Sequence, residues 1–410
     1  MKSEKTFLAA AGFAAIFLSA CFNNGKNNTV KVGILHSTTG TMASSESSVI
    51  NAEKMAIDEI NEKGGVLGKK IQIVQADGKS DANIFAEEAR RLWTKEGVAA
   101  IFGCWTSASR KAVQAVLEEP DIFGLLWYPL QYEGMEASPN IMYIGAAPNQ
   151  QVVPSIEYCV EKFGKRMYLI GSDYIFPRTA NKIIKALLKN LEGVCAGESY
   201  VPLESMDFEK NVQEIIASRP DIIINTINGD SNKAFFEALR KAGITPKDIP
   251  VMSFSISEEE VSYIGAALLE GEYVTWNYFQ TIASFKNKNF VQRYKELYGA
   301  DKSIGDPMEA AYVSVYLWSL ACEKAGTFDV EPVRMAAKGL SFDGPNGIVK
   351  IDASNQHLQQ KIRIGRINSR GMIDTIWESS GTVKPDPYLS AYAWAKGLQD
   401  FTQRRAPLKK

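Results

Sequence analysis

The chain has few of the residues on which most catalytic and metal sites depend. It contains two histidines, His36 and His357, among 410 residues. Multi-histidine metal centres are therefore excluded, and a Ser/His/Asp triad would have only two candidate bases. We expect no metal site, no cofactor and no enzymatic activity, and we expect His36 to be a hydrogen-bonded structural residue.

Cysteine is also scarce, and its spacing excludes the common thiol sites. No CxxC pair occurs, so neither a zinc ribbon nor a dithiol redox motif is present. A disulfide between Cys159 and Cys195 cannot be decided from spacing, and we expect none. The five cysteines are Cys21, Cys104, Cys159, Cys195 and Cys322.

Excess charge and phosphate-binding loops are absent. Forty-six Lys and Arg residues balance 47 Asp and Glu residues, giving a formal net charge of -1. Such a surface has no long-range attraction for nucleic acid, which is therefore not an expected partner. No GxGxxG or GxxxxGK[ST] string is present to hold phosphates. A chain of this length predicts about two domains.

The first twenty residues predict a secretory signal peptide. Lys2 and Lys5 precede an apolar run from Phe7 to Leu18, which is too short to span a bilayer. The following Leu18-Ser19-Ala20-Cys21 resembles a bacterial lipobox, so Cys21 is the predicted site of lipidation and membrane attachment. The alternative is a plain cleavage site with a chance cysteine. Residues 21–29 then form a polar tether, and the folded body lies outside the cytoplasm.

From Thr29 onward, short β-branched runs alternate with stretches of helical periodicity. This alternation predicts two α/β units with parallel sheets. The predicted strands are 30–35, 71–76, 99–103 and 122–128 in the first unit, and 166–171, 221–227, 250–254 and 272–276 in the second. Residues 347–351 and 361–367 resemble a hairpin, which suggests crossover connections between the units.

The residues that follow these strands are mostly aromatic or neutral hydrogen-bonding residues. Ligands of open parallel sheets bind outside the carboxyl ends of the strands, where the loops surround a crevice. These ends contain very few lysines and arginines, so we expect a small, uncharged ligand. They include residues 104–107, 127–132, 172–176, 228–231 and 276–278.

Several long strings resemble the type 1 periplasmic binding proteins. They are VKVGILHSTTGTMA, FGCWTSASRKAV, WYPLQYEG, SPNIMYIGAAPNQQ, IGSDYIFPR, INTINGDSN and DPMEAAY. The closest resemblance is to the urea-binding lipoprotein of urea ABC transporters, with short-chain amide receptors as relatives. This resemblance implies an α/β fold of two Rossmann-like lobes joined by hinge crossovers. It also implies a membrane permease with cytoplasmic ATPases as partner.

The resemblance divides the chain between the lobes. It places 30–148 plus about 278–350 in lobe I, and 149–277 plus about 351–376 in lobe II. Residues 377–410 remain as a C-terminal segment.

In the first lobe, the resemblance assigns three ligand contacts to the CWTS and WYP strings. Ser107 would hold a ligand carbonyl with its hydroxyl and backbone N–H, and it could also serve as a helix N-cap. Trp105 and Tyr128 would form aromatic walls of an amide pocket, although an aromatic residue at a strand end is often part of the core.

In the second lobe, Tyr174 and Phe176 would face those walls. Gln131 follows an aliphatic residue, as in the urea-binding branch, and would accept hydrogen bonds from ligand N–H groups. Asp230 would do the same with a charge-assisted bond, or would instead cap the helix that starts near Ser231. Trp276 lies at a hinge crossing, where packing and ligand contact are both open.

These features predict a lipid-anchored receptor that captures urea between two lobes and delivers it to an ABC permease. The alternatives are a receptor for short aliphatic amides or branched-chain amino acids, and an amide sensor. The run Glu258-Glu259-Glu260 is predicted to be a solvated helix start, although Glu258 lies nearer the cleft.

Overall fold

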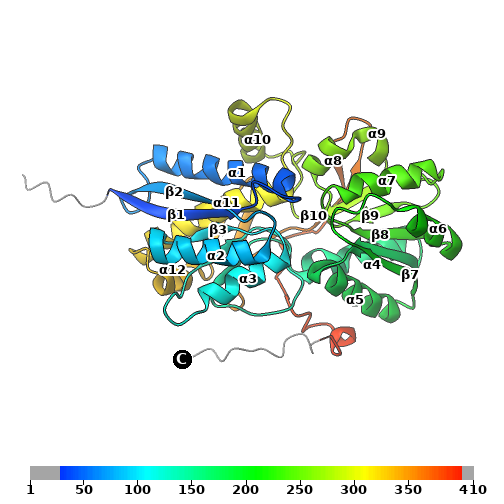
Figure 1. Cartoon of the computed structure of the whole chain (residues 1–410), viewed down its shortest axis with the longest axis horizontal. Coiled ribbons are helices and arrows are strands. Elements are labelled where there is room, and N and C mark those ends of the chain that lie inside the picture. The colour runs from blue at the N-terminus through cyan, green and yellow to red at the C-terminus, as the bar shows by residue number, and fades with distance from the viewer. Residues whose placement is uncertain (1–27, 399–410) are drawn as a thin grey trace, which may run out of the picture.

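The computed structural model describes residues 28–398. The predicted signal peptide and Cys21 therefore lie outside the described residues. Two lobes lie side by side, each built from a sheet flanked by helices (Figure 1). The expected two-lobe α/β architecture is confirmed. Within residues 28–398, no helix is long and apolar enough to cross a membrane.

The first lobe contains a five-stranded sheet in the order β2-β1-β3-β4-β5. All of its strand pairs are parallel, as the alternating pattern predicted. The strands are β1 (Thr29–His36), β2 (Lys70–Asp77), β3 (Ile101–Gly103), β4 (Leu126–Tyr128) and β5 (Ile141–Tyr143). The connecting helices are α1 (Ala43–Glu62), α2 (Ala82–Arg91) and α3 (Ser107–Leu117).

The second lobe contains a seven-stranded sheet in the order β15-β14-β10-β9-β8-β6-β7. The pairs from β10 to β7 are parallel, whereas β14 and β15 are added antiparallel. The strands are β6 (Arg166–Ser172), β7 (Val194–Val201), β8 (Ile222–Thr226), β9 (Val251–Ser253), β10 (Tyr273–Trp276), β14 (Arg363–Ile367) and β15 (Ile373–Glu378).

The second lobe begins with a helix, and its other helices lie between its strands in sequence. They are α4 (Val152–Lys162), α5 (Ile175–Asn190), α6 (Glu209–Ser218), α7 (Ser231–Lys241), α8 (Glu258–Ile264) and α9 (Ala266–Leu269). Sequence periodicity did not predict β7. This edge strand is only partly buried and contains Gly197, so it lacks the apolar run that marks the central strands.

The chain then returns to the first lobe. The returning elements are α10 (Phe285–Tyr298), α11 (Asp306–Ala325), α12 (Val330–Ala337), β11 (Ser341–Gly344), β12 (Gly347–Ile351) and β13 (Leu358–Gln359). The expected hairpin between 347–351 and 361–367 is wrong. Strand β12 pairs with β11 and β13, whereas β14 pairs with β10 and β15, because the two segments belong to different sheets.

Buried apolar residues locate the three crossings between the lobes. The core of the first lobe includes Ile144, Tyr278 and Leu358. The cores of the second lobe include Val152 and resume at Ile364. The chain therefore changes lobe between 144 and 152, next to Tyr278, and between 358 and 364. The last change is later than the expected position near 351.

Candidate functional site

The carboxyl ends of the two sheets face each other across the interlobe junction, and the lobes touch there. The Gln131 Nε2 atom of the first lobe lies 3.4 Å from the Phe254 carbonyl oxygen of the second. Ser45 Oγ on α1 lies 3.3 Å from Glu260 Oε1 on α8. Two hollows of about 300 and 450 Å³ open at this junction, and Asp230 lines both. The structure is therefore a closed form of the two lobes.

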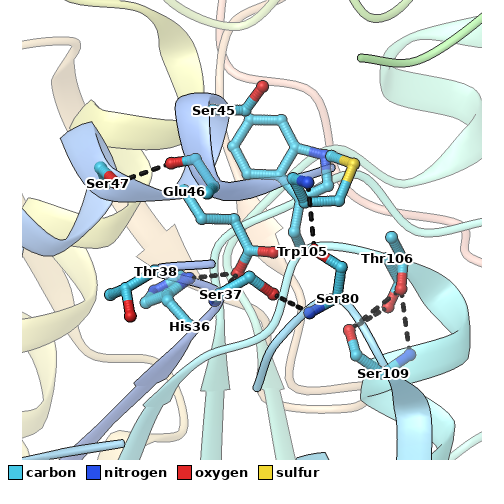
Figure 2. A network of polar contacts seen from close by, with 12 residues as sticks. His36, Ser37, Thr38, Ser45, Glu46, Ser47, Ser80, Trp105, Thr106 and Ser109 are labelled. Carbon is cyan, nitrogen blue, oxygen red and sulfur yellow. Dashed lines mark hydrogen bonds and ion pairs between the residues drawn. The ribbon is translucent and has the colours of Figure 1, made fainter. Parts of the chain in front are cut away.

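Ser107 is the first residue of α3, and its hydroxyl binds a buried carboxylate. Its Oγ donates to Glu133 Oε2 at 2.7 Å. The helix is capped instead by Thr106, whose hydroxyl accepts the N–H of Ser109 at 3.1 Å (Figure 2). The N-cap role considered for Ser107 is therefore wrong. The first N–H groups of a helix lack intrahelical acceptors, so the backbone here can still donate.

Glu133 is held by a fully buried arginine. Arg110 Nη2 lies 2.6 Å from Glu133 Oε1, and Arg110 Nη1 lies 3.0 Å from Oε2. Burial acts to raise the pKa of Glu133, but the Arg110 charge, with hydrogen bonds from Arg110 and Ser107, lowers it below its ordinary value. Glu136 also pairs with Arg110, at 2.9 Å. The guanidinium of Arg110 is thus paired with two carboxylates of the protein itself.

Trp105 and Tyr128 lie at adjacent strand ends of the first lobe. Both are buried, and the Tyr128 hydroxyl donates to the Trp105 carbonyl at 2.9 Å. The guanidinium of Arg110 lies 5.1 Å from the centre of the Tyr128 ring. Cys104, directly before Trp105, adopts a left-handed backbone with φ of 66°, which is uncommon for a non-glycine residue and often occurs at functional loops.

Tyr174 brings the second lobe against this cluster. Its pKa is raised by burial and by the charge of Glu133, while a hydrogen bond with Asn228 opposes the rise. Tyr174 therefore lies near a first-lobe carboxylate. Phe176 is 3% exposed but belongs to none of the three apolar cores.

Gln131 lies at the interlobe junction. Its side chain is buried, and its Nε2 atom contacts the second lobe. Its Oε1 atom is buried without a hydrogen-bond partner among the described residues. Buried acceptors are rarely left unpaired, so this oxygen is available to a donor on a ligand.

Asp230 and Trp276 do not join this cluster. Asp230 is exposed, its side chain makes no cap hydrogen bond, and it bonds instead to Tyr263. The capping role considered for Asp230 is therefore wrong. The indole N–H of Trp276 donates to the Ile256 carbonyl at 2.7 Å, and the ring belongs to a core of the second lobe. Packing within the second lobe therefore explains the position of Trp276.

His36 has the structural role expected from the sequence. Its Nδ1 lies 3.0 Å from Glu46 Oε2, and its Nε2 lies 3.1 Å from Glu53 Oε1 (Figure 2 shows His36 and Glu46). Burial acts to lower the pKa of His36, but Glu53 and Glu46 raise it to about 10. Glu46 also accepts the N–H of Ser37 at 2.9 Å. The contacts of Glu46 with His36 and Ser37 fix the loop that leads from β1 to α1.

Sequence reasoning missed Arg110 and Glu133 as members of the site. Both lie within the FGCWTSASRKAV and WYPLQYEG strings, but no local pattern marks an ion pair across 23 positions. Among residues 28–398, no group of three or more His, Cys, Asp or Glu residues could hold a metal ion.

Comparison with known proteins supports the two-lobe fold. Leu/Ile/Val-binding protein homolog 7 of Brucella melitensis is 24% identical over 376 residues, covering 86% of this chain and 92% of the relative. A solute-binding protein of an ABC transporter from Rhodopseudomonas palustris, solved with 3,4-dihydroxybenzoic acid, superposes with a TM-score of 0.78 at 21% identity, covering 87% of this chain and 99% of that one.

A branched-chain amino acid transporter substrate-binding protein from Streptococcus pneumoniae, solved with isoleucine, gives a TM-score of 0.74 at 22% identity, covering 87% of this chain and all of that one (100%). Residues 30–393 match the family described as the periplasmic binding protein domain. The chain therefore belongs to the periplasmic binding protein family.

Proposed function

We propose that this protein captures a small solute between its lobes outside the cytoplasm and delivers it to the permease of an ABC transporter. Family membership and the closed interlobe junction support this role. The signal-like N-terminus, with Cys21 as the lipid attachment site, supports a membrane-anchored receptor. Ligand that contacts both lobes favours the closed form, which the permease then recognises.

For the ligand, we infer urea, with short aliphatic amides as the nearest relatives. The observation that carries this inference is the supply of hydrogen-bond acceptors at the junction. Gln131 Oε1 is buried without a partner among the described residues, and the buried Arg110 of the same lobe is taken up by Glu133 and Glu136. Urea offers four N–H donors and no charge, so it matches acceptors that need donors.

Branched-chain amino acids are the second candidate, and the named relatives favour them. The Brucella homologues are named for leucine, isoleucine and valine, and solved relatives hold isoleucine or benzoates. None of the relatives reported above is named for urea. These ligands carry a carboxylate. At the junction it would have to accept hydrogen bonds from neutral donors, such as the N–H groups at the start of α3.

Calorimetric titration of the purified protein without its N-terminal segment (residues 28–410) tests urea and branched-chain amino acids as ligands. The ligands are urea, acetamide, leucine, isoleucine and 4-hydroxybenzoate, each titrated under identical buffer and salt. Saturable binding of urea, without detectable binding of leucine or 4-hydroxybenzoate, supports urea as the ligand. Tight leucine or isoleucine binding without a urea response overturns it and leaves the amino-acid receptor.

A further inference from the structure

The hydroxyl of Ser107 has its single proton committed to Glu133. An ionised carboxylate has no proton to donate, so the 2.7 Å contact between Ser107 Oγ and Glu133 Oε2 must use the serine O–H as donor. What remains on Oγ is its two lone pairs. Ser107 can therefore accept a hydrogen bond from a ligand but cannot donate one.

Glu133 is kept ionised by its surroundings. Arg110 binds both of its oxygens, and neither residue is accessible to solvent at its side chain. Glu136 shares the same guanidinium but makes no contact with Ser107. The ion pair is thus a fixed part of the first lobe, and the direction of the Ser107 hydrogen bond is fixed with it.

Contacts of Gln131 show that this arrangement lies at the interlobe boundary. Its Nε2 atom lies 3.4 Å from the carbonyl oxygen of Phe254 in the second lobe. Gln131, two positions before Glu133, carries the unpartnered acceptor Oε1. Ser107 Oγ and Gln131 Oε1 are neutral hydrogen-bond acceptors, and the Glu133 carboxylate behind them is negatively charged. A negatively charged oxygen on a ligand would be repelled by these groups.

From these contacts we propose that Glu133 is a specificity-determining residue, which sets Ser107 as a hydrogen-bond acceptor and so selects N–H-bearing amides over carboxylates. This inference rests on the proposed function, since it concerns the ligand of the same site. Glu133 acts through Ser107 and is therefore a positioning residue. The backbone N–H groups at the start of α3 remain free to bind the carbonyl of the same amide.

Acetamide and acetate provide a matched pair of probes. They have nearly the same shape, but acetate replaces the N–H donors with a charged oxygen. We expect the wild-type protein to bind acetamide at least about 100-fold more tightly than acetate, since two acceptor contacts are lost and each contributes about tenfold. The measured quantity is the ratio of the two dissociation constants, obtained by calorimetry.

Three variants test which residues determine the ratio of the two dissociation constants. Ser107→Ala keeps the ion pair intact and should lower the ratio about tenfold through weaker acetamide binding. Glu133→Gln removes the charge and replaces one carboxylate oxygen with an NH2 donor, so Ser107 is no longer fixed as an acceptor and the ratio should fall to a similar extent. Glu136→Gln removes a charge from the same arginine without touching Ser107, so it should preserve the wild-type ratio.

The outcomes separate this inference from the proposed function. If wild-type protein binds urea but Ser107→Ala and Glu133→Gln keep the wild-type ratio, the inference is overturned while the function stands. If wild-type protein binds acetate or isoleucine as tightly as acetamide, the selection against carboxylates is overturned. Should Glu133→Gln fail to fold, Ser107→Ala alone decides between these results.

Discussion

The hydroxyl of Ser48, on α1 of the first lobe, donates a hydrogen bond to Oε2 of Glu259, on α8 of the second lobe. Ser45 and Glu260 make a second contact between the same helices. Both contacts join the two lobes. Burial, followed by the charge of Glu260, raises the pKa of Glu259 to about 8 from a value of 4.5, while the hydrogen bond from Ser48 and then the charge of Lys302 oppose the rise.

Ligand affinity should therefore fall as pH rises through this window. If opening returns Glu259 to solvent, its pKa drops toward 4.5, so the closed form holds more protons between about pH 4.5 and 8. The stability of closure that this proton supplies is present at low pH and is lost as pH rises to about 8. Affinity should decrease by up to about tenfold per pH unit, then level off. Calorimetric titration across this range measures the slope.

Glu259→Gln provides the control, because glutamine keeps an acceptor for Ser48 and does not ionise. Its affinity should vary less with pH than that of the wild-type protein. Ser48→Ala retains the carboxylate and should keep the pH dependence while binding more weakly throughout. A Glu259→Gln protein with the wild-type slope would show that other groups control closure.

Replacing Arg110 by alanine should destabilise the fold strongly. Arg110 neutralises the fully buried Glu133, so its removal leaves that carboxylate without a counter-charge, whereas the partly buried Glu136 keeps Lys111. The free energy of unfolding should drop by about 3 to 5 kcal/mol. Guanidinium chloride is the suitable denaturant, since urea is a proposed ligand. Lys111→Ala removes a partly exposed partner of Glu136 and should cost less than about 1 kcal/mol. Equal losses in both variants would contradict this account.

The architecture was predictable because buried parallel strands leave a strong local pattern. The run 222–224 is apolar and β-branched, and helices such as α5 and α7 keep one apolar face. Parallel strand ends meet at one edge of a sheet, which is why the sequence predicts that Ser107, Tyr128 and Tyr174 lie near a common crevice.

Long-range burial of charge could not be predicted in this way. Glu258 and Glu260 read locally as a solvated helix start, yet both are buried because α8 packs against the first lobe and the hinge. Asp230 gave the opposite result. It has the chemistry of a ligand acceptor, but the turn before α7 leaves it at the exposed rim. Burial here depends on which lobe covers a residue, and that information is not local.

Glu258 should make the stability of the protein dependent on pH. Burial raises its pKa to about 8, and the N–H of Gln280, which donates to Oε1 at 2.7 Å, only partly offsets this effect. The protonated form is the stable one, so stability is present at low pH and is lost as pH rises from 4.5 to about 8. Thermal unfolding should show a falling Tm over this range.

Glu258→Gln should flatten this decline, because glutamine keeps an acceptor for Gln280 and cannot ionise. Asp306 and Glu309, buried nearby, should maintain part of the slope. The matched control is Glu270→Gln, at an exposed position on the same lobe, which should follow the wild-type curve. Identical curves for Glu258→Gln and wild type would contradict the prediction.

Asp230→Asn should change urea affinity by less than about threefold. The carboxylate is exposed and its contact is with Tyr263, so solvent screens its charge and a ligand would gain little from it. Ser107→Ala, at a buried position, should weaken acetamide binding by about tenfold in the same assay. The comparison is informative because both positions were candidates from sequence chemistry alone. Loss of urea binding in Asp230→Asn with retained folding would mean that the turn before α7 moves inward when ligand binds, and that Asp230 then becomes an acceptor.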